Sequence, residues 1–338
     1  MKVLVIGSGA IGSIVAGCLS LKGIDVDIAC KNQGLSDLVN SDGLIFKVKN
    51  RKYIQFIHAY PGVPAVPGNY DYIFLATKTF DIEKPAKDVL DKMNTQGLIV
   101  SLQDGYCADK LARIAGTESV VGSVIGWGAT LKPDGTAEMS SGGDMIIGKL
   151  DGSDDPRLDN LQYLLNFVVP TRVVDNIHEH IFSKLIINSC VTTLGAISGL
   201  RIGALITDRN MRNIFIKILQ EGITIANALK FEIPEFAGRL NYYRFIRGKS
   251  LYHRVRKHLF IRMFGIKYRK VKSSGLQSLE RGEKTEIEFL NGYLLNKANE
   301  MGIEIPVNQR LVELIYEIES KKRKISPKNL YDPLFRLR

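Results

Sequence analysis

The sequence lacks any run of 18 or more apolar residues, so its composition does not indicate a membrane-spanning helix. The apolar first twenty residues lack a basic leading stretch, which argues against a signal peptide. Only four cysteines occur among 338 residues, and none forms a Cys-x-x-Cys pair. Such cysteines are typical of free thiols in a reducing compartment, so we expect a cytoplasmic protein. The pair His178 and His180 has no third ligand nearby, so no metal is expected.

Acidic residues are absent from the segment 241–272, which contains eleven Lys and Arg. Because the net charge of the chain is +11, this segment accounts for all of the excess. The leading interpretation is a solvated basic face on helices of a second domain, or the interface of a homodimer. An amphipathic segment on an anionic membrane surface is the next interpretation, and a nucleic-acid patch is the least favoured. We expect no nucleic-acid partner.

A glycine-rich turn follows the first predicted strand directly. Residues 2–6 are apolar, and the chain continues as Gly7-Ser8-Gly9-Ala10-Ile11-Gly12 before a helix of small residues. In this G-x-G-x-x-G pattern the first glycine permits a tight turn, and the second lets the backbone approach a pyrophosphate. The third lets the helix pack closely on the strand, and the helix N-terminus attracts phosphate. The order of strand, glycines and helix therefore predicts that these six residues bind a dinucleotide.

The pattern of apolar residues divides the chain into two halves. Residues 1–174 alternate short apolar strands with helical stretches, as in an α/β Rossmann fold with a doubly wound parallel sheet. Strands are expected at residues 2–6, 24–30, 72–76, 97–102 and 119–124, with a hairpin or meander over 130–149. From His180 onward, long helical patterns dominate. We therefore expect a nucleotide-binding domain over 1–174 and an all-helical domain over 175–338.

Charged residues follow three of the expected strands. Asp25 and Asp27 come too early in the second strand to bind a ribose and alternate with apolar residues, so we interpret them as solvent-facing. Lys31 stands at the end of that strand, where a basic residue accepts the 2′-phosphate of NADP (NADPH). Lys78 and Asp104 follow two further strands. Because ligands bind at the carboxyl ends of such strands, both residues are expected to face the cofactor.

A helix with unusual polar residues is predicted in the second half. Residues 181–194 are nearly all apolar, which is typical of a buried helix. Lys184 and Asn188 interrupt it one turn apart on the same face. A buried lysine requires a partner and can acquire a pKa suited to proton transfer, whereas a lysine in an exposed first turn would extend to solvent. Glu286 is a candidate carboxylate partner, with a surface helix position as the alternative.

Several of these motifs together resemble the ketopantoate reductase (2-dehydropantoate 2-reductase) family. Besides the glycine turn, the matching residues are Lys78, Gln103-Asp104-Gly105, Lys184-Leu185-Ile186-Ile187-Asn188, Ser273-Ser274 and Thr285-Glu286-Ile287-Glu288-Phe289-Leu290-Asn291-Gly292. The resemblance covers nearly the whole chain, apart from extra residues within about 240–272. It implies a Rossmann domain joined to a helical domain like that of 6-phosphogluconate dehydrogenase, with NADPH and substrate in the cleft between them.

The resemblance also implies a role for each matching residue. Lys184 is implied to be the general acid that protonates the ketone oxygen of the substrate, and Glu286 to hold and polarise that lysine. Asn188 is implied to contact the substrate, and Ser274 to bind its carboxylate. This assignment agrees with the chemistry, because hydride delivery to a carbonyl builds negative charge on oxygen that an ammonium group can stabilise and protonate.

Two further residues match the cofactor site of the family, and two others depart from its pattern. Lys31 matches the residue that takes the 2′-phosphate, and Lys78 a lysine near the nicotinamide and substrate. Asp104 and Thr192 stand where the family usually has Asn, and an ionised Asp104 would repel a substrate carboxylate unless a cation paired with it.

The leading prediction is an NADPH-dependent reduction of a 2-oxo acid, resembling ketopantoate to pantoate in pantothenate biosynthesis. A different 2-oxo acid or imine as substrate, or a non-catalytic NADP(H)-binding regulatory protein, are the alternatives.

Overall fold

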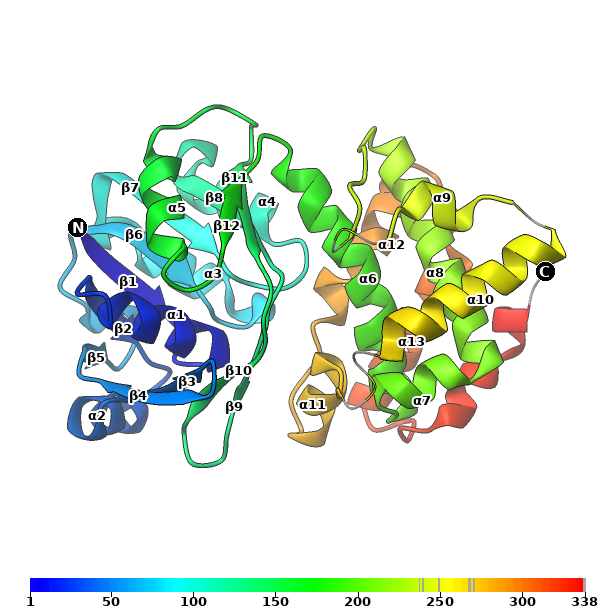
Figure 1. Ribbon diagram of the computed structural model, residues 1–338, viewed down its shortest axis with the longest axis horizontal. Helices are drawn as coiled ribbons and strands as arrows, with labels where there is room; N and C mark the ends of the chain where they lie inside the picture. The colour runs from blue at the N-terminus through cyan, green and yellow to red at the C-terminus, as the bar shows by residue number, and fades with distance from the viewer. Residues whose placement is uncertain (237, 239, 249, 267–268, 270, 337–338) are drawn as a thin grey trace. The chain divides into compact units, whose positions relative to one another are not determined.

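The computed structural model describes residues 1–236, 238, 240–248, 250–266, 269 and 271–336. The chain divides into two compact units, Met1–Ile181 and Phe182–Arg338 (Figure 1). The first is an α/β unit and the second is helical, as the sequence predicts. The boundary expected between residues 174 and 175 lies a few residues before this division, just after the last strand of the first unit.

An eight-stranded sheet runs through the first unit, residues 1–181, all of which the structure describes. Its strand order is β12-β11-β8-β7-β6-β1-β2-β5. The strands are β1 (Lys2–Ile6), β2 (Asp25–Ala29), β5 (His58–Tyr60), β6 (Tyr70–Leu75), β7 (Met93–Ser101), β8 (Val120–Ile125), β11 (Met145–Lys149) and β12 (Thr171–Val173). In this eight-stranded sheet, every neighbouring pair is parallel except β11 on β8. The five predicted strands are confirmed, because strands buried on both faces are continuous apolar runs.

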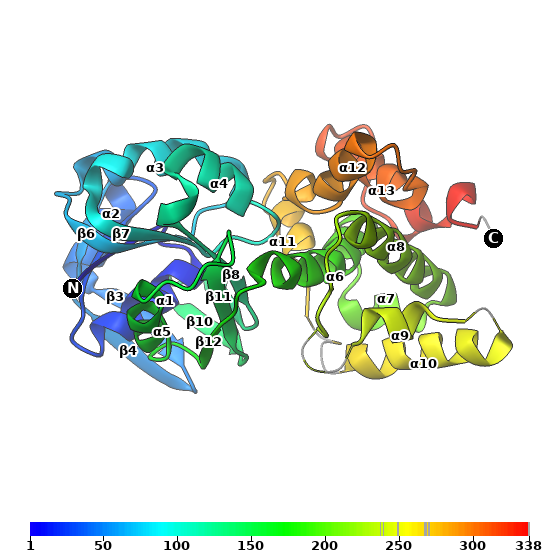
Figure 2. The ribbon, with the colours of Figure 1, turned by 90° about the horizontal axis from the view of Figure 1, so that it is seen from above.

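Helices cover both faces of this sheet. Figure 2 shows α3 and α4 along one side of it and α1 and α5 along the other, which is the doubly wound arrangement. The helices of the unit are α1 (Ala10–Ser20), α2 (Gln33–Asp42), α3 (Glu83–Asp88), α4 (Ala108–Ala115) and α5 (Arg157–Leu165). Short 3₁₀ turns lie at η1 (Val63–Ala65), η2 (Thr79–Asp81), η3 (Leu90–Lys92) and η4 (Thr117–Ser119).

A second, smaller sheet packs on the outer side of α1. It has the order β4-β3-β10-β9, with β3 (Leu44–Val48), β4 (Arg51–Gln55), β9 (Gly128–Leu131) and β10 (Ala137–Ser141). The pair β9 and β10 forms an antiparallel hairpin within the predicted meander, whereas β3 and β4 were not predicted. Phe46 of β3 is fully buried, and a Cβ on Gly17 of α1 would lie 2.5 Å from its ring. Helix α1 is therefore held between two sheets, and only a glycine fits at this contact.

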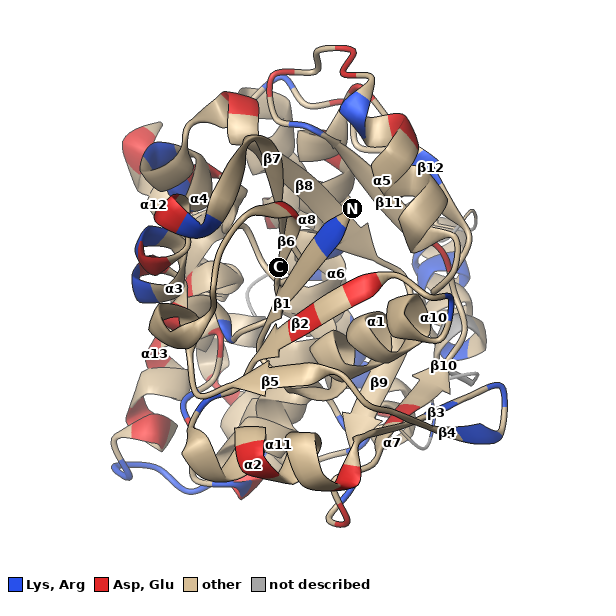
Figure 3. Cartoon of the chain, turned by 90° about the vertical axis from the view of Figure 1, so that its left-hand side faces the viewer, with Lys and Arg blue, Asp and Glu red and all other residues tan. Residues whose placement is uncertain are grey.

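Asp27 of β2 is buried, so the prediction that it faces solvent is wrong. The residue is 1% exposed, whereas Asp25 is exposed as expected. The Tyr70 hydroxyl donates a hydrogen bond of 2.6 Å to the Asp27 carboxylate, and Lys2 Nζ lies 3.2 Å from the same oxygen. Figure 3 shows the acidic segments of β2 beside the basic segment of β1. A carboxylate can be buried here because the neighbouring strands supply both a hydrogen bond and a charge.

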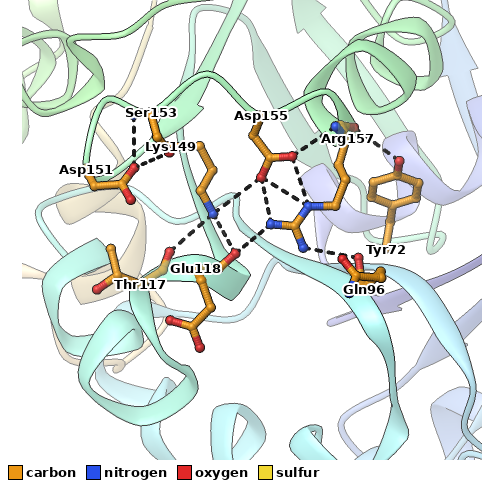
Figure 4. Close-up of polar contacts among 9 residues, drawn as sticks. All are labelled: Tyr72, Gln96, Thr117, Glu118, Lys149, Asp151, Ser153, Asp155 and Arg157. Carbon is orange, nitrogen blue, oxygen red and sulfur yellow. Dashed lines mark hydrogen bonds and ion pairs between the residues drawn. The ribbon is translucent and has the colours of Figure 1, made fainter.

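An ion-pair network closes the edge of the sheet where β11 ends (Figure 4). Lys149 is 2% exposed, and its Nζ donates to the carbonyl oxygens of Glu118 at 2.6 Å and Thr117 at 3.3 Å. The same Nζ lies 3.7 Å from the carboxylate of Asp155, which also accepts hydrogen bonds of 2.9 and 2.7 Å from Arg157. Burial lowers the pKa of Lys149, whereas the hydrogen bond from Arg157 lowers the pKa of Asp155. The network fastens the loop before α5 to the starts of β7 and β8.

The second unit is helical throughout its described residues, apart from an isolated bridge between Phe236 and Leu240. Its helices are α6 (Ile177–Ser198), which begins in the first unit, α7 (Ile202–Thr207), α8 (Arg209–Ala228), α9 (Tyr242–Ile246), α10 (Leu251–Ile266), α11 (Ser274–Glu280), α12 (Asn291–Glu300) and α13 (Pro306–Glu319). Short 3₁₀ turns are η5 (Ile287–Phe289), η6 (Pro327–Tyr331) and η7 (Pro333–Arg336). By length and composition α6 alone among the described helices could cross a membrane, but 83% of its most apolar window is buried inside the protein, as expected of a core helix.

We expect Asp155→Asn to lower the free energy of unfolding by about 3 kcal/mol at pH 7, because it leaves Lys149 buried without its charge partner. The pKa of Asp155 is lowered in the folded state, so its contribution is complete above its unfolded pKa and is lost as the pH falls through the folded value. The difference from wild type should therefore shrink below about pH 4. Urea unfolding followed by fluorescence of the single, buried Trp127 measures both effects.

The control for this experiment is Asp154→Asn, which removes the adjacent and exposed carboxylate. Equal stabilities of the Asp155 and Asp154 variants at pH 7 would show that the network does not stabilise the fold.

Candidate active site

The glycine turn requires glycine at two of its positions. Gly7 has a φ of +108°, which L side chains rarely adopt, and a Cβ there would lie 2.9 Å from the Ala76 carbonyl oxygen. A Cβ on Gly12 would lie 2.0 Å from the carbonyl oxygen of Gly7. Helix α1 therefore packs directly on the turn only because both residues lack a side chain.

The space beside Gly9 is open, in contrast to the space beside Gly7 and Gly12. A Cβ built on Gly9 would meet no atom of the described residues within 4 Å. Gly9 is also the N-cap of α1 and supplies no side chain to the first-turn N–H groups, and that turn contains no acidic residue. Ser8, Ala10 and Ile11 are partly exposed around it. These residues fit the pyrophosphate of a dinucleotide, which bare N–H groups at a helix N-terminus bind.

The other charged residues predicted for the cofactor site lie at the same edge of the sheet as the glycine turn. The strands β2, β1, β6 and β7 are adjacent and parallel, so the residues after their carboxyl ends come together. Lys31 is exposed just beyond β2, whereas Lys78 and Asp104 are half-buried beyond β6 and β7. The structure thus brings the glycine turn and all three charged residues to one edge.

Gln103 holds two of these loops together, although the sequence analysis assigns it no separate role. Its side-chain amide donates hydrogen bonds of 3.2 and 3.1 Å to the carbonyl and hydroxyl oxygens of Thr77, and one of 3.2 Å to the Lys78 carbonyl. The side chain is 9% exposed. A glutamine at a strand end is a common loop residue, so only the fold shows that this one fixes the backbone of the Lys78 loop.

A second contact joins the loop after β7 to the first turn of α6. The Tyr106 hydroxyl is hydrogen-bonded to His178 Nδ1, and the two rings stack with centroids 5.8 Å apart. Among the described residues there is no group of three or more His, Cys, Asp or Glu that could hold a metal ion. The His178 side chain therefore has a structural contact with Tyr106 that accounts for its position.

Helix α6 carries a polar stripe on an otherwise buried surface. Lys184, Asn188 and Thr192 follow one another at intervals of four residues, so they lie on one face of the helix. Lys184 and Asn188 are half-buried and Thr192 is 8% exposed. This face presents an amine, an amide and a hydroxyl in a row.

Ser274 lies beside the C-terminal end of this stripe. Its Oγ is 3.5 Å from Oγ1 of Thr192. The preceding Ser273 caps α11 by accepting a hydrogen bond from Leu276 N–H, and donates one of 3.2 Å to the Thr192 carbonyl. A Cβ on Gly195 would lie 2.3 Å from Ser273 Oγ, so the start of α11 packs closely on α6. The capped start of α11 thus packs on α6, and this contact places Ser274 next to Thr192.

Glu286 lies half-buried at the start of η5, in a segment anchored from α13. The neighbouring Thr285 donates hydrogen bonds of 2.7 Å from its N–H and its hydroxyl to the Glu319 carboxylate. The Thr285 hydroxyl also accepts a hydrogen bond of 3.3 Å from Ile287 N–H. These contacts fix the backbone on both sides of Glu286.

Asn291, at the end of the same segment, ties it to α6. Its fully buried amide donates to the Ser189 carbonyl at 3.2 Å and to Asn308 Oδ1 at 2.8 Å, and accepts from the Thr193 hydroxyl at 2.5 Å. Asn308 in turn donates to Glu221, whose pKa is raised by burial. Asn291 belongs to a motif that matches the family, without an implied role, and the structure shows that its hydrogen bonds hold the 285–291 segment against α6.

The fold and these residues define a class of protein. A glycine turn at the carboxyl edge of a doubly wound sheet, joined to a helical unit with a lysine on its core helix, is the architecture of a dinucleotide-dependent oxidoreductase. The models for "Ketopantoate reductase PanE/ApbA" and "Ketopantoate reductase PanE/ApbA C terminal" match residues 3–152 and 176–319. The chain therefore belongs to the ketopantoate reductase family, which confirms the resemblance seen in its sequence.

Similar proteins span almost the whole chain. The 2-dehydropantoate 2-reductases of Pyrococcus horikoshii and Archaeoglobus fulgidus are 27% and 25% identical to it, over 95% and 94% of this chain and 98% of each relative. Among solved structures, a PanE/ApbA family ketopantoate reductase from Ralstonia eutropha has a TM-score of 0.81 at 23% identity, covering 95% of this chain and 99% of that one. A D-mandelate dehydrogenase with NADH and anilino(oxo)acetate has a TM-score of 0.79 at 18% identity, with the same coverage.

We expect Gly9→Ala to weaken dinucleotide binding and Gly12→Ala to lower the stability of the fold. The Gly9 variant should weaken dinucleotide binding by about tenfold or more, equivalent to about 1.4 kcal/mol, because its methyl group enters the open space. Its stability should change by less than about 1 kcal/mol. The Gly12 variant should lose about 2 kcal/mol of stability, since its methyl group meets the Gly7 carbonyl. Titration of NADPH by fluorescence and urea unfolding measure the two quantities, and unchanged NADPH affinity of a folded Gly9 variant would contradict the assignment.

Proposed function

We propose that this protein reduces a 2-oxo acid to the corresponding 2-hydroxy acid, with NADPH as hydride donor and Lys184 as general acid. The observation that carries the proposal is the polar stripe of α6, in which Lys184 precedes Asn188 and Thr192, with Ser274 beside the last of these. The membership of the ketopantoate reductase family supports it, as do curated relatives that carry the name 2-dehydropantoate 2-reductase over almost their full length.

The role of Lys184 follows from the charge that the reaction creates. Reduction of a ketone places negative charge on its oxygen, and a positioned ammonium stabilises that charge and then transfers its proton to the oxygen. The half-buried position of Lys184 strengthens this effect, because nearby water screens the charge less than it would at the surface. We assign to Glu286 the task of keeping the ammonium charged and oriented, and this task suits the anchored backbone on either side of it.

The remaining residues of the stripe suit the acid group of the substrate. Asn188 and Thr192 offer an amide and a hydroxyl, and Ser274 adds a second hydroxyl next to Thr192. Such groups donate hydrogen bonds to a carboxylate. We therefore assign substrate contact to Asn188 and Thr192, and carboxylate binding to Ser274.

For the cofactor, the residues of the first unit fit a nicotinamide dinucleotide, which supplies the hydride when bound. The open side of Gly9 and the start of α1 would hold its pyrophosphate, and Ser8, Ala10 and Ile11 surround that position. We assign to the exposed Lys31 the 2′-phosphate that distinguishes NADPH from NADH. Lys78, whose loop Gln103 fixes, would lie toward the nicotinamide end.

Asp104 makes the identity of the substrate a separate question. It is half-buried at the same sheet edge as Lys78, where an ionised carboxylate disfavours a second carboxylate nearby. Every 2-oxo acid carries such a carboxylate, so we propose that the preferred acceptor is a 2-oxo acid other than ketopantoate, with a cationic group that pairs with Asp104. We also propose that the protein acts in the cytoplasm. The cysteines support this compartment, because the four in this chain are buried and free, and all four lie within the described residues.

We expect the wild-type chain to oxidise NADPH with at least one acceptor in a panel of 2-oxo acids that includes ketopantoate, pyruvate and benzoylformate. Lys184→Ala should lower kcat by about 10²- to 10⁴-fold, because the transition state loses its acid, while NADPH affinity stays unchanged. Lys324→Ala, which removes an exposed lysine, is the matched control. Absence of turnover with every acceptor would favour a non-catalytic NADP(H)-binding protein.

We expect Lys31→Ser to raise the KM for NADPH by about tenfold, since it removes a charged hydrogen bond worth about 1.5–3 kcal/mol. The KM for NADH should remain as in the wild type, because NADH has no 2′-phosphate. Lys52→Ser, on the exposed strand β4, serves as the control. The ratio of kcat/KM for the two cofactors is the measurement, and an equal effect on both would assign Lys31 to general stability of the loop.

A further inference from the structure

The helix α10 exposes a stripe of large apolar side chains. The exposed fractions are 75% for Leu251, 72% for Tyr252, 58% for Val255, 56% for Leu259 and 64% for Met263. Val255, Leu259 and Met263 follow Leu251 at successive intervals of four, and Tyr252 precedes Val255 by three, so the five residues lie on one face of the helix. The sequence favours a solvated basic face in this segment, whereas the structure shows that the outer face of α10 is mainly apolar.

The opposite face of α10 is attached to the helical unit by specific contacts. Lys257 is 5% exposed and donates hydrogen bonds of 2.7 and 3.0 Å to the carbonyl oxygens of Ile246 and Gly248. A Cβ on Gly265 would lie 2.2 Å from the Ile206 side chain, so α10 packs tightly on α7. Figures 1 and 2 both show α10 on the outer side of the helical unit. Rotation of α10 to bury its apolar stripe would therefore break contacts that the fold already makes.

Exposed basic residues lie on the same helix as the stripe and on the segment before it. Arg254 and Arg262 are exposed on α10, and Arg244 and Arg247 are exposed on and just after the preceding helix α9. The sequence from 241 to 272 contains no acidic residue that could neutralise them locally. Long arginine side chains can lie along an apolar surface while the guanidinium reaches polar groups at its border. The exposed surface of α10 thus combines apolar and cationic side chains.

We propose that α10 docks flat on an anionic phospholipid surface, with its apolar stripe among the acyl chains and its arginines at the phosphate groups. A helix of 16 residues is about 24 Å long, enough for its four turns to contact the surface together. Helices with this distribution of apolar and basic residues bind in the plane of a membrane interface. A second copy of the chain is a poorer occupant, since it would bring the same arginines into contact. Nucleic acid offers phosphates but no apolar phase for four aliphatic side chains.

The test is co-sedimentation of the full chain with vesicles at low salt. We expect binding to vesicles that contain phosphatidylglycerol and none to vesicles of phosphatidylcholine alone, with loss of binding at high salt. Leu251→Ser with Leu259→Ser should lower binding by about tenfold or more, because it removes apolar contact. Arg254→Ser with Arg262→Ser should lower it about 25-fold, since each basic residue near an anionic surface contributes about fivefold.

Matched controls use exposed residues of the first unit, namely Leu38→Ser with Leu131→Ser and Arg51→Ser with Lys52→Ser. Both control variants should bind as the wild type does, and circular dichroism confirms that all four variants are folded. The proposal is overturned if the wild type fails to bind phosphatidylglycerol vesicles, or if the α10 and control variants bind equally. If the wild type fails to bind and the Leu251/Leu259 variant converts a dimer to a monomer in analytical ultracentrifugation, the occupant of the stripe is a second copy of the chain.

Discussion

The contact between Gly12 and the Gly7 carbonyl is the constraint on which the first unit depends. A side chain on Gly12 would lie 2.0 Å from that oxygen, so α1 can approach β1 this closely only without one. The close approach places the helix N-terminus at the sheet edge, and it also lets the second sheet cover the outer side of α1 through Phe46 and Gly17. One backbone contact thus sets both the proposed pyrophosphate site and the packing of the layers.

In the helical unit, the corresponding constraint is the buried side-chain amide of Asn291. Asn291 joins α6, α12 and α13 through hydrogen bonds to Ser189, Thr193 and Asn308. Ser189 and Thr193 each follow directly after a residue of the polar stripe. The Asn291 amide is therefore hydrogen-bonded to the same turns of α6 that carry the proposed substrate groups. The buried side-chain amides of Asn291 and Asn308 are both hydrogen-bonded, and such pairing makes their geometry specific.

The strands of the main sheet were predictable because central parallel strands are continuous apolar runs, as in residues 72–76 and 97–102. The β3–β4 hairpin was missed because its half-exposed strands mix apolar and basic residues. Asp27 was misplaced because alternation along one strand cannot reveal Tyr70 and Lys2 on its neighbours. The residues of the candidate site were predicted from motifs, and the grouping of the glycine turn, Lys31, Lys78 and Asp104 at the sheet edge follows from topology. Anchors such as Gln103 needed the fold, since a hydrogen bond between distant loops leaves no local pattern.

The Lys149 network has a consequence for how this protein can change over evolution. Lys149 pairs in register with Val121, near the start of β8, so the network lies at the amino edge of the parallel strands. Lys78 and Asp104 follow the carboxyl ends of β6 and β7, at the other edge. The residues of the Lys149 network are therefore separated by the length of a strand from those that we propose to face a ligand. Mutations that alter the accepted substrate can accumulate at one edge while the other keeps the fold above its threshold of stability.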